Sequence, residues 1–186
     1  MKKYMVKTIH DRKAVTAMSM ANASLYHAND PLKIAGLGTV LIALGFILRG
    51  SIPPAVSTVL ILIGCLVFSN ADYSAKSDAR KVLQQMGENF PTIQLSFSDN
   101  AIAIQTPEQS GTLDYHRIKR LGEDHAYFFL FLGDHHAYVL DKAGFITGSA
   151  DTFPAFIEAK TDLTIEPALG FWHKILTCKL PWRLKR

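Results

Sequence analysis

The sequence has little cysteine: only Cys65 and Cys178 occur among its 186 residues. A disulfide framework is therefore not expected, because small disulfide-rich folds need several closely spaced cysteines. The sequence also lacks HExxH, GxSxG and paired CxxC motifs, a Walker-type loop and a GxGxxG turn after a strand. These absences argue against metalloproteases, α/β-hydrolases and nucleotide-binding enzymes. We expect no catalytic residues, no metal site and no cofactor.

A strong basic stripe is missing as well. The formal net charge is +4, and basic residues gather in the first 13 residues, around residues 76–81 and in the C-terminal tail. No zinc-finger, RNP or helix-turn-helix signature occurs. Nucleic acid is therefore not an expected partner. The distribution of positive charge favours a membrane surface instead.

Two apolar runs follow each other where charge is almost absent. Residues 34–68 contain a single charged residue, Arg49. The first run, residues 32–48, would be about 26 Å long as a helix, slightly short of a hydrocarbon core of about 30 Å. Residues 49–54 contain a glycine and two prolines, which are typical of a turn, and the second run extends to Phe68. We interpret residues 32–69 as a transmembrane helical hairpin, rather than a buried hairpin of a soluble core, because neither run has a polar face.

The basic residues beside the apolar runs predict the topology. Arg49 is the only one in the connecting turn, whereas both flanks are richer. The flanking basic residues are Lys2, Lys3, Lys7, Arg12, Lys13, Lys33, Lys76, Arg80 and Lys81. We expect a multi-pass protein of the inner (plasma) membrane with two spans and both termini in the cytoplasm.

The segments on either side of the hairpin show helical spacing. Residues 1–31 form a cytoplasmic N-terminal arm, in which residues 2–9 either form a short strand or remain frayed and residues 12–27 form an amphipathic helix. Residues 70–90 form a connecting helix that ends near Gly87.

From Thr92 the apolar residues alternate with polar ones, which is the period of a β-strand. The pattern predicts a hairpin that turns at residues 98–100, then strands at residues 111–115, 117–121, 126–132 and 136–140, with turns at residues 122–124 and 133–135. A helix follows at residues 153–160. We therefore expect an α+β fold, with a small curved sheet capped by a helix over residues 91–162 and a tail over residues 163–186.

A family resemblance rests on several of these residues. They are Tyr115-x-x-Ile118, Glu123, the run 127–130, the run 136–142, Phe145 and Gly148. Together they resemble the YcxB-like family of bacterial membrane proteins, most clearly over residues 92–160. The resemblance implies a two-span hairpin followed by a pleckstrin-homology-like (PH-like) domain, and it supplies no catalytic residues. Asp141 stands where we expect a proline of the family pattern, which affects only the turn there.

Histidines and acids gather in the predicted turns. His125, His135 and His136 lie near Asp124, Asp134 and Asp141, and such side chains bind transition metals where they converge. Neighbouring residues of a strand point to opposite faces, so His135 and His136 could not share one site. We interpret these side chains as solvated turn residues.

Two groups of residues are candidates for contact with lipid or a partner. Arg117, Lys119 and Arg120 place cations opposite Ile118, although the acidic turn 98–100 favours a solvated basic face over a headgroup pocket. The tail adds Trp172, Lys174, Lys179, Trp182, Arg183, Lys185 and Arg186. Tryptophan with basic residues is typical of an interfacial segment, and the alternative is a frayed tail.

The resulting functional hypothesis is a membrane-anchored adaptor or regulator without catalysis, whose cytoplasmic domain binds a protein partner or the lipid surface. The lipid bilayer is the expected partner, together with another protein or a second copy of the chain. An immunity or envelope-defence protein against a membrane-active toxin is one alternative. A lipid-modifying membrane enzyme that uses the histidines and acids is the other.

Overall fold

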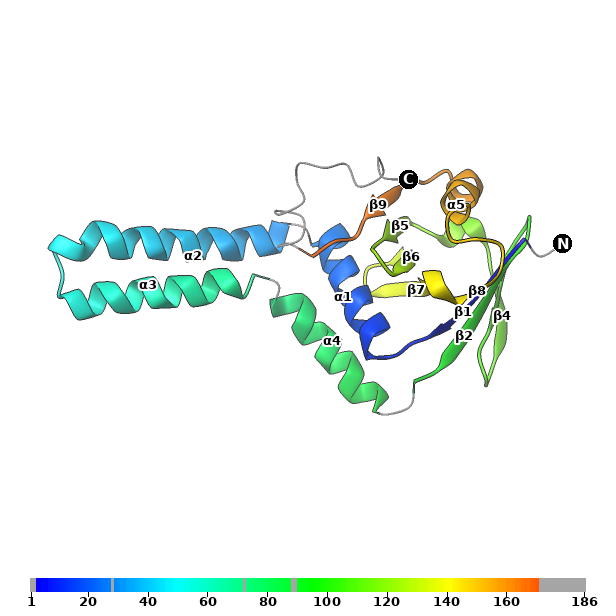
Figure 1. Cartoon of the computed structure of the whole chain (residues 1–186), viewed down its shortest axis with the longest axis horizontal. Coiled ribbons are helices and arrows are strands. Elements are labelled where there is room, and N and C mark those ends of the chain that lie inside the picture. Colours follow the sequence, from blue (N-terminus) through cyan, green and yellow to red (C-terminus); the bar gives the residue numbers. More distant parts are fainter. Residues whose placement is uncertain (1–2, 28, 72, 88–89, 171–186) are drawn as a thin grey trace. The chain divides into compact units, whose positions relative to one another are not determined.

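The computed structural model describes residues 3–27, 29–71, 73–87 and 90–170. These residues form two compact units (Figure 1). The helical unit includes residues 27–74, and the mixed unit combines residues 1–26 with residues 75–169. The predicted α+β composition is confirmed. Residues 1–26, which precede the apolar runs, fold with residues that follow them.

The helical unit is an antiparallel pair of helices. Helix α2 spans Asn29–Ile47, a short 3₁₀ turn η1 spans Leu48–Gly50, and α3 spans Pro54–Ser69. Pro54 occupies the first turn of α3, where its missing N–H leaves no helical hydrogen bond unmade. Length and composition allow one helix of the described chain, Asn29–Gly50, to cross a membrane, and α3 is apolar but shorter.

Glycines allow α2 and α3 to approach each other closely. A Cβ atom added at Gly38 would lie 2.8 Å from the carbonyl oxygen of Gly64, and one added at Gly64 would lie 2.8 Å from that of Gly38. Both distances are shorter than any tolerated contact. By contrast, a Cβ atom at Gly36 would meet no atom within 4 Å. The helices therefore pack through Gly38 and Gly64, and Gly36 lies on an open face.

We expect Gly64→Leu to weaken the pairing of α2 with α3, because the added side chain must displace the backbone of α2. Overpacking of this kind costs about 1–3 kcal/mol. Hydrogen exchange of the detergent-solubilised chain, read by mass spectrometry, should show faster exchange over residues 29–69. Gly36→Leu is the matched control and should leave the rates unchanged. Equal rates in the two variants would contradict this packing.

The mixed unit contains two sheets and three helices. The helices are α1 (Arg12–Tyr26), α4 (Tyr73–Met86, of which residues 75–86 belong to this unit) and α5 (Phe153–Thr161). The strands are β1 Tyr4–Ile9, β2 Thr92–Phe97, β3 Ile102–Gln105, β4 Ser110–Leu113, β5 Arg120–Glu123, β6 Tyr127–Gly133, β7 His136–Asp141, β8 Phe145–Thr147 and β9 Ile165–Pro167. The first sheet has the order β4-β3-β2-β1-β8, and the second has the order β7-β6-β5-β9. Among the strands of the described residues, only β9 pairs in parallel, with β5.

Strand β1 joins the two parts of the mixed unit. It pairs antiparallel with β2, with Val6 opposite Leu95, and on its other side with β8. Of the two alternatives for residues 2–9, the strand is therefore correct over Tyr4–Ile9. In the first sheet the neighbouring strands β1 and β2 are separated in the sequence by the helical unit, because β1 precedes it and β2 follows it.

The structure corrects several predicted boundaries. The strand predicted at residues 111–115 is β4, which ends at Leu113. Residues Tyr115–Arg117 form a 3₁₀ turn, so the strand predicted at residues 117–121 begins only at Arg120. The turn predicted at residues 122–124 is also shifted, because Gly122 and Glu123 continue β5. The chain reverses at Asp124 instead, whose Oδ1 accepts hydrogen bonds from the backbone N–H groups of Ala126 and Tyr127.

Strand β6 is buried on both faces. Phe128 and Leu130 point into the core between the sheets, whereas Phe129 and Phe131 point to the opposite face. There they pack against the small-residue face of α1, including Ala21. A strand covered on both sides needs apolar residues throughout, which explains the continuous run in β6.

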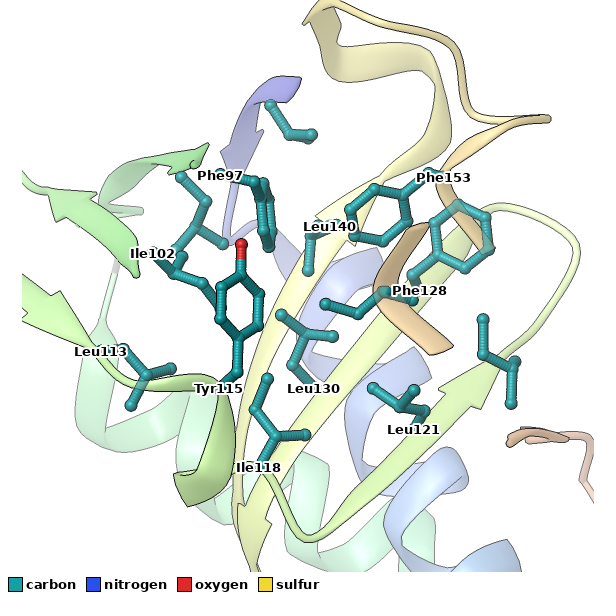
Figure 2. Packing of buried hydrophobic residues seen from close by; sticks show 14 residues of the cluster. Phe97, Ile102, Leu113, Tyr115, Ile118, Leu121, Phe128, Leu130, Leu140 and Phe153 are labelled. Carbon is teal, nitrogen blue, oxygen red and sulfur yellow. The ribbon is translucent and has the colours of Figure 1, made fainter. Parts of the chain in front are cut away.

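The main core lies between the two sheets and is closed by α5. Figure 2 shows side chains of both sheets pointing toward one another, with Phe153 of α5 among them. The rings of Phe97 and Phe153 meet edge to face, with centroids 5.0 Å apart. The Tyr115 hydroxyl donates a hydrogen bond of 2.6 Å to the backbone oxygen of Ser98, and burial raises the pKa of Tyr115 to about 12.

Candidate functional site

The candidate cations Arg117 and Lys119 lie between the 3₁₀ turn and β5 rather than on the strand that the alternation predicted, since Arg117 ends the turn and β5 begins at Arg120. Arg117 and Lys119 are exposed, and Ile118 between them is buried. The backbone N–H of Lys119 donates to the carbonyl oxygen of Phe131 at 2.7 Å, which fixes the segment against the start of the second sheet. The two cations are therefore presented to solvent from a segment that is hydrogen-bonded to β6.

Arg120 has a different environment. Its guanidinium forms a two-pronged ion pair with Glu166, at 3.1 and 3.2 Å, and also donates to the backbone oxygen of Leu25. The guanidinium carbon lies 5.1 Å from the ring centre of Tyr26, a cation–π arrangement. Arg120 thus ties β5 to β9 and to the end of α1. These contacts leave it less available to an outside phosphate than Arg117 and Lys119.

The aromatic and basic candidates of the tail lie outside the described residues. They are Trp172, Lys174, Lys179, Trp182, Arg183, Lys185 and Arg186. Their expected contact with the membrane surface stays a prediction.

The turn between β6 and β7 is held by an asparagine that the sequence did not single out. The Asn22 side-chain nitrogen lies 3.1 Å from Oδ1 of Asp134 and 3.1 Å from Nδ1 of His135. Asn22 Oδ1 also accepts a hydrogen bond from the backbone N–H of His135. His135 has a φ of 63°, so it occupies the turn rather than a strand, and His136 begins β7. These contacts of Asn22 attach the turn between β6 and β7 to α1.

His10 is a partly buried titratable group that sequence reasoning missed. Its Nε2 atom is buried and has no hydrogen-bond partner in the described part of the chain. Burial lowers the pKa of His10 below 6.5, and a hydrogen bond with the backbone of Val139 and the charge of Asp11 offset part of this effect. The folded state therefore favours the neutral ring.

We expect the mixed unit to lose stability as the pH falls below about 6.5. Below that pH the unfolded chain takes up a proton on His10 more readily than the folded chain, so acid favours unfolding. Urea denaturation at about pH 7.5 and about pH 5.5 would measure the difference. His10→Gln should reduce it, whereas His116→Gln, at an exposed position, should not. An identical pH dependence in both variants would show that His10 is not the cause.

The mixed unit contains a buried ion pair between Glu123 and Lys142. Glu123 is 1% exposed, and its Oε1 lies 2.8 Å from Nζ of Lys142. The ammonium also donates to the backbone oxygen of Asp124 and lies 4.7 Å from the ring centre of Phe128. A charge removed from water needs such a partner. The pair joins the end of β5 to the residue after β7, where we expected only a turn.

The comparisons with known proteins bear on this same part of the chain. Residues 97–159 match the family model described as YcxB-like protein. This segment is YcxB-like. A search of curated proteins and a search of solved structures each found no significant match. The predicted family is therefore confirmed for this segment.

The YcxB-like segment runs from the end of β2 into α5. Of the residues that carried the resemblance, Tyr115, Ile118, Phe128 and Leu140 are buried in the main core. Glu123 forms the buried ion pair. These residues of the resemblance therefore pack in the core of the YcxB-like segment or, in the case of Glu123, form its buried ion pair. Strand β1 lies outside the matched residues but completes the sheet.

Proposed function

We propose that this chain is a membrane-anchored adaptor or regulator without catalysis. In this proposal α2 and α3 insert into the cell membrane as two spans. They hold a PH-like domain, formed by the mixed unit, at the cytoplasmic surface. There the domain binds a protein partner or the lipid surface.

The observation that carries the proposal is the exposed apolar surface of the helical unit. In the most apolar window of Asn29–Gly50 only 22% of the residues are buried, whereas a core helix of a soluble protein would be mostly buried. Large apolar side chains point outward from both helices, with exposures between 42% and 75%: Leu32, Leu37, Val40, Leu44, Phe46, Ile47, Val56, Val59, Leu62, Ile63 and Leu66. An uncovered surface of this kind is unstable in water and stable in lipid.

The lengths of the two helices are compatible with insertion. Helix α3 has 16 residues, which corresponds to about 24 Å. That is shorter than a hydrocarbon core of about 30 Å, and local thinning of the bilayer or contributions from the flanking turns can accommodate the difference.

The pairing of β1 with β2 supports the proposed topology. β1 precedes the helical unit and β2 follows it, yet the two strands exchange backbone hydrogen bonds in one sheet. Both must therefore lie on the same side of any membrane that contains the hairpin. The basic flanks favour the cytoplasm as that side, since the connecting turn carries only Arg49.

The arrangement of the mixed unit supports a PH-like domain. Its two sheets enclose one core, and α5 closes that core. The adaptor role rests on the exposed cations Arg117 and Lys119 and on the absence of a catalytic motif from the sequence. A fold alone does not specify an activity, so binding is inferred from the surface.

Membrane fractionation tests the anchoring. We expect the full chain to stay in the membrane pellet after alkaline carbonate washing, and reporters fused at residue 1 and residue 186 to give cytoplasmic signals opposite to a reporter at Gly50. Release by carbonate would overturn the anchor, and opposite signals at the two termini would overturn the topology. Recovery of the chain without any partner after gentle detergent extraction would leave only lipid as the ligand.

A further inference from the structure

The mixed unit has a groove that the proposed function has not used. It is lined by Arg12, the first residue of α1, and by Arg80, Leu83, Gln84 and Gly87 at the end of α4. Its volume is about 400 Å³. That size is within the usual range of small-molecule sites, about 300–1,000 Å³.

The α4 residues of the groove share one face because they recur at spacings of three and four. Ala75 and Ala79 lie on the buried side of the helix and leave Arg80 exposed. Gly87, with a φ of 63°, ends α4, and its N–H donates to the oxygen of Leu83. A larger residue would be strained in this conformation. Helix α4 therefore ends directly before Gly87, which itself lines the groove.

Arg12 is also held in position. Asp11 caps α1, since its Oδ1 accepts a hydrogen bond of 2.8 Å from the backbone N–H of Ala14. The backbone oxygen of Arg12 accepts a hydrogen bond of 2.7 Å from the Thr16 hydroxyl. The backbone from which Arg12 extends is thus ordered, although its side chain is exposed.

The charge of the groove is not compensated. In the described residues neither Arg12 nor Arg80 forms an ion pair, and no carboxylate lines the groove. Of the described acids close to these residues in sequence, Asp11 caps α1 and Asp78 pairs with Lys81. Elsewhere in the unit Arg120 and Lys142 each meet a glutamate. The described lining of the groove thus carries two guanidinium groups and no acid, which favours an anion.

We propose that this groove binds a phosphate ester. Two guanidinium groups match the oxygens of a phosphate, the Gln84 amide offers a further donor, and Leu83 gives an apolar wall for the carbon atoms of the ester. The phosphate comes from a lipid headgroup or from a soluble phosphate ester. The lipid source rests on the proposed function, because the membrane anchor would bring headgroups to the mixed unit.

The test uses the full chain in a maltoside detergent, which contains no phosphate. Titration calorimetry with glycerol 3-phosphate examines the soluble source, and mixed micelles that contain phosphatidic acid examine the lipid source. We expect Arg12→Gln and Arg80→Gln each to weaken binding about tenfold. Lys76→Gln removes the same charge from the exposed surface of α4 outside the groove and should change little.

Each outcome decides the proposal. Loss of glycerol 3-phosphate binding in both arginine variants supports a soluble ligand, and loss of phosphatidic acid binding alone supports a headgroup. Failure of the unaltered chain to bind either probe overturns the proposal, and so does an equal effect of Lys76→Gln. Binding in detergent does not depend on insertion, so a chain that fails the carbonate test can still bind, and the two failures are distinguishable.

Discussion

Val6→Asp is expected to unfold the mixed unit. Val6 is completely buried in β1, between β2 and the edge strand β8 of the five-stranded sheet, and packs in the main core. A carboxylate there would have no partner and would cost more than a domain of this size can lose, about 5–15 kcal/mol being the usual total stability. Circular dichroism and limited proteolysis of the full chain in detergent should show loss of the sheets with α2 and α3 retained.

Ile9→Asp is the matched control for Val6→Asp. Ile9 lies in the same strand but is 56% exposed. Its carboxylate would stay in water, so proteolysis should proceed as in the unaltered chain. If Val6→Asp also stays folded, residues 4–9 do not form the buried strand described above.

Lys142→Met is expected to destabilise the mixed unit by about 3–5 kcal/mol, because it leaves the carboxylate of Glu123 buried without its cation. Burial of Glu123 is nearly complete, and the ammonium of Lys142 is its charged partner at 2.8 Å. Urea denaturation followed by tyrosine fluorescence or circular dichroism would measure the loss of free energy of unfolding.

Two further variants separate the buried pair from a general effect of charge. Removal of both charges in the double variant Glu123→Gln with Lys142→Met should recover much of the stability, since no isolated charge remains. Lys81→Met, which breaks an exposed pair with Asp78, should have little effect. A double variant less stable than Lys142→Met alone would mean that the pair is not the reason for the loss.

Local patterns in the sequence predicted most elements of this fold. Helical spacing placed α1, α4 and α5 correctly, and the apolar runs gave α2 and α3. The strands β2 and β3 followed from alternation, and β6 and β7 followed from the short turn between two strand candidates. These elements depend on neighbours in the sequence, which is why periodicity detects them.

The elements and contacts that were not predicted depend on partners far away in the sequence. Strands β8 and β9 have three residues each and exist because they pair with β1 and β5, so no local pattern marks them. Glu123 looked like a turn residue because an acidic side chain is rarely buried, and its partner Lys142 is reached only after β6 and β7.

The same reason limits the prediction of the site. Arg117 and Lys119 were singled out because they alternate with Ile118 within one segment. The groove lined by Arg12 and Arg80 was not predicted, because the helical unit separates the two residues in the sequence. Spacing cannot indicate a site whose parts meet only after β1 and α1 have joined the later strands.

The position of β1 also has a consequence for biosynthesis. β1 leaves the ribosome before α2, α3 and α4, whereas β2, its neighbour on one side, is made only after them, and β8, on the other side, later still. Because synthesis proceeds at about 5–20 residues per second, β1 remains unpaired for several seconds before β2 is made. Assembly of the sheet therefore follows completion of the helical hairpin, and a nascent chain whose hairpin had left its two ends in different compartments could never close the sheet. Under the proposed insertion of α2 and α3, only chains with both ends in one compartment could close the sheet and become resistant to proteolysis.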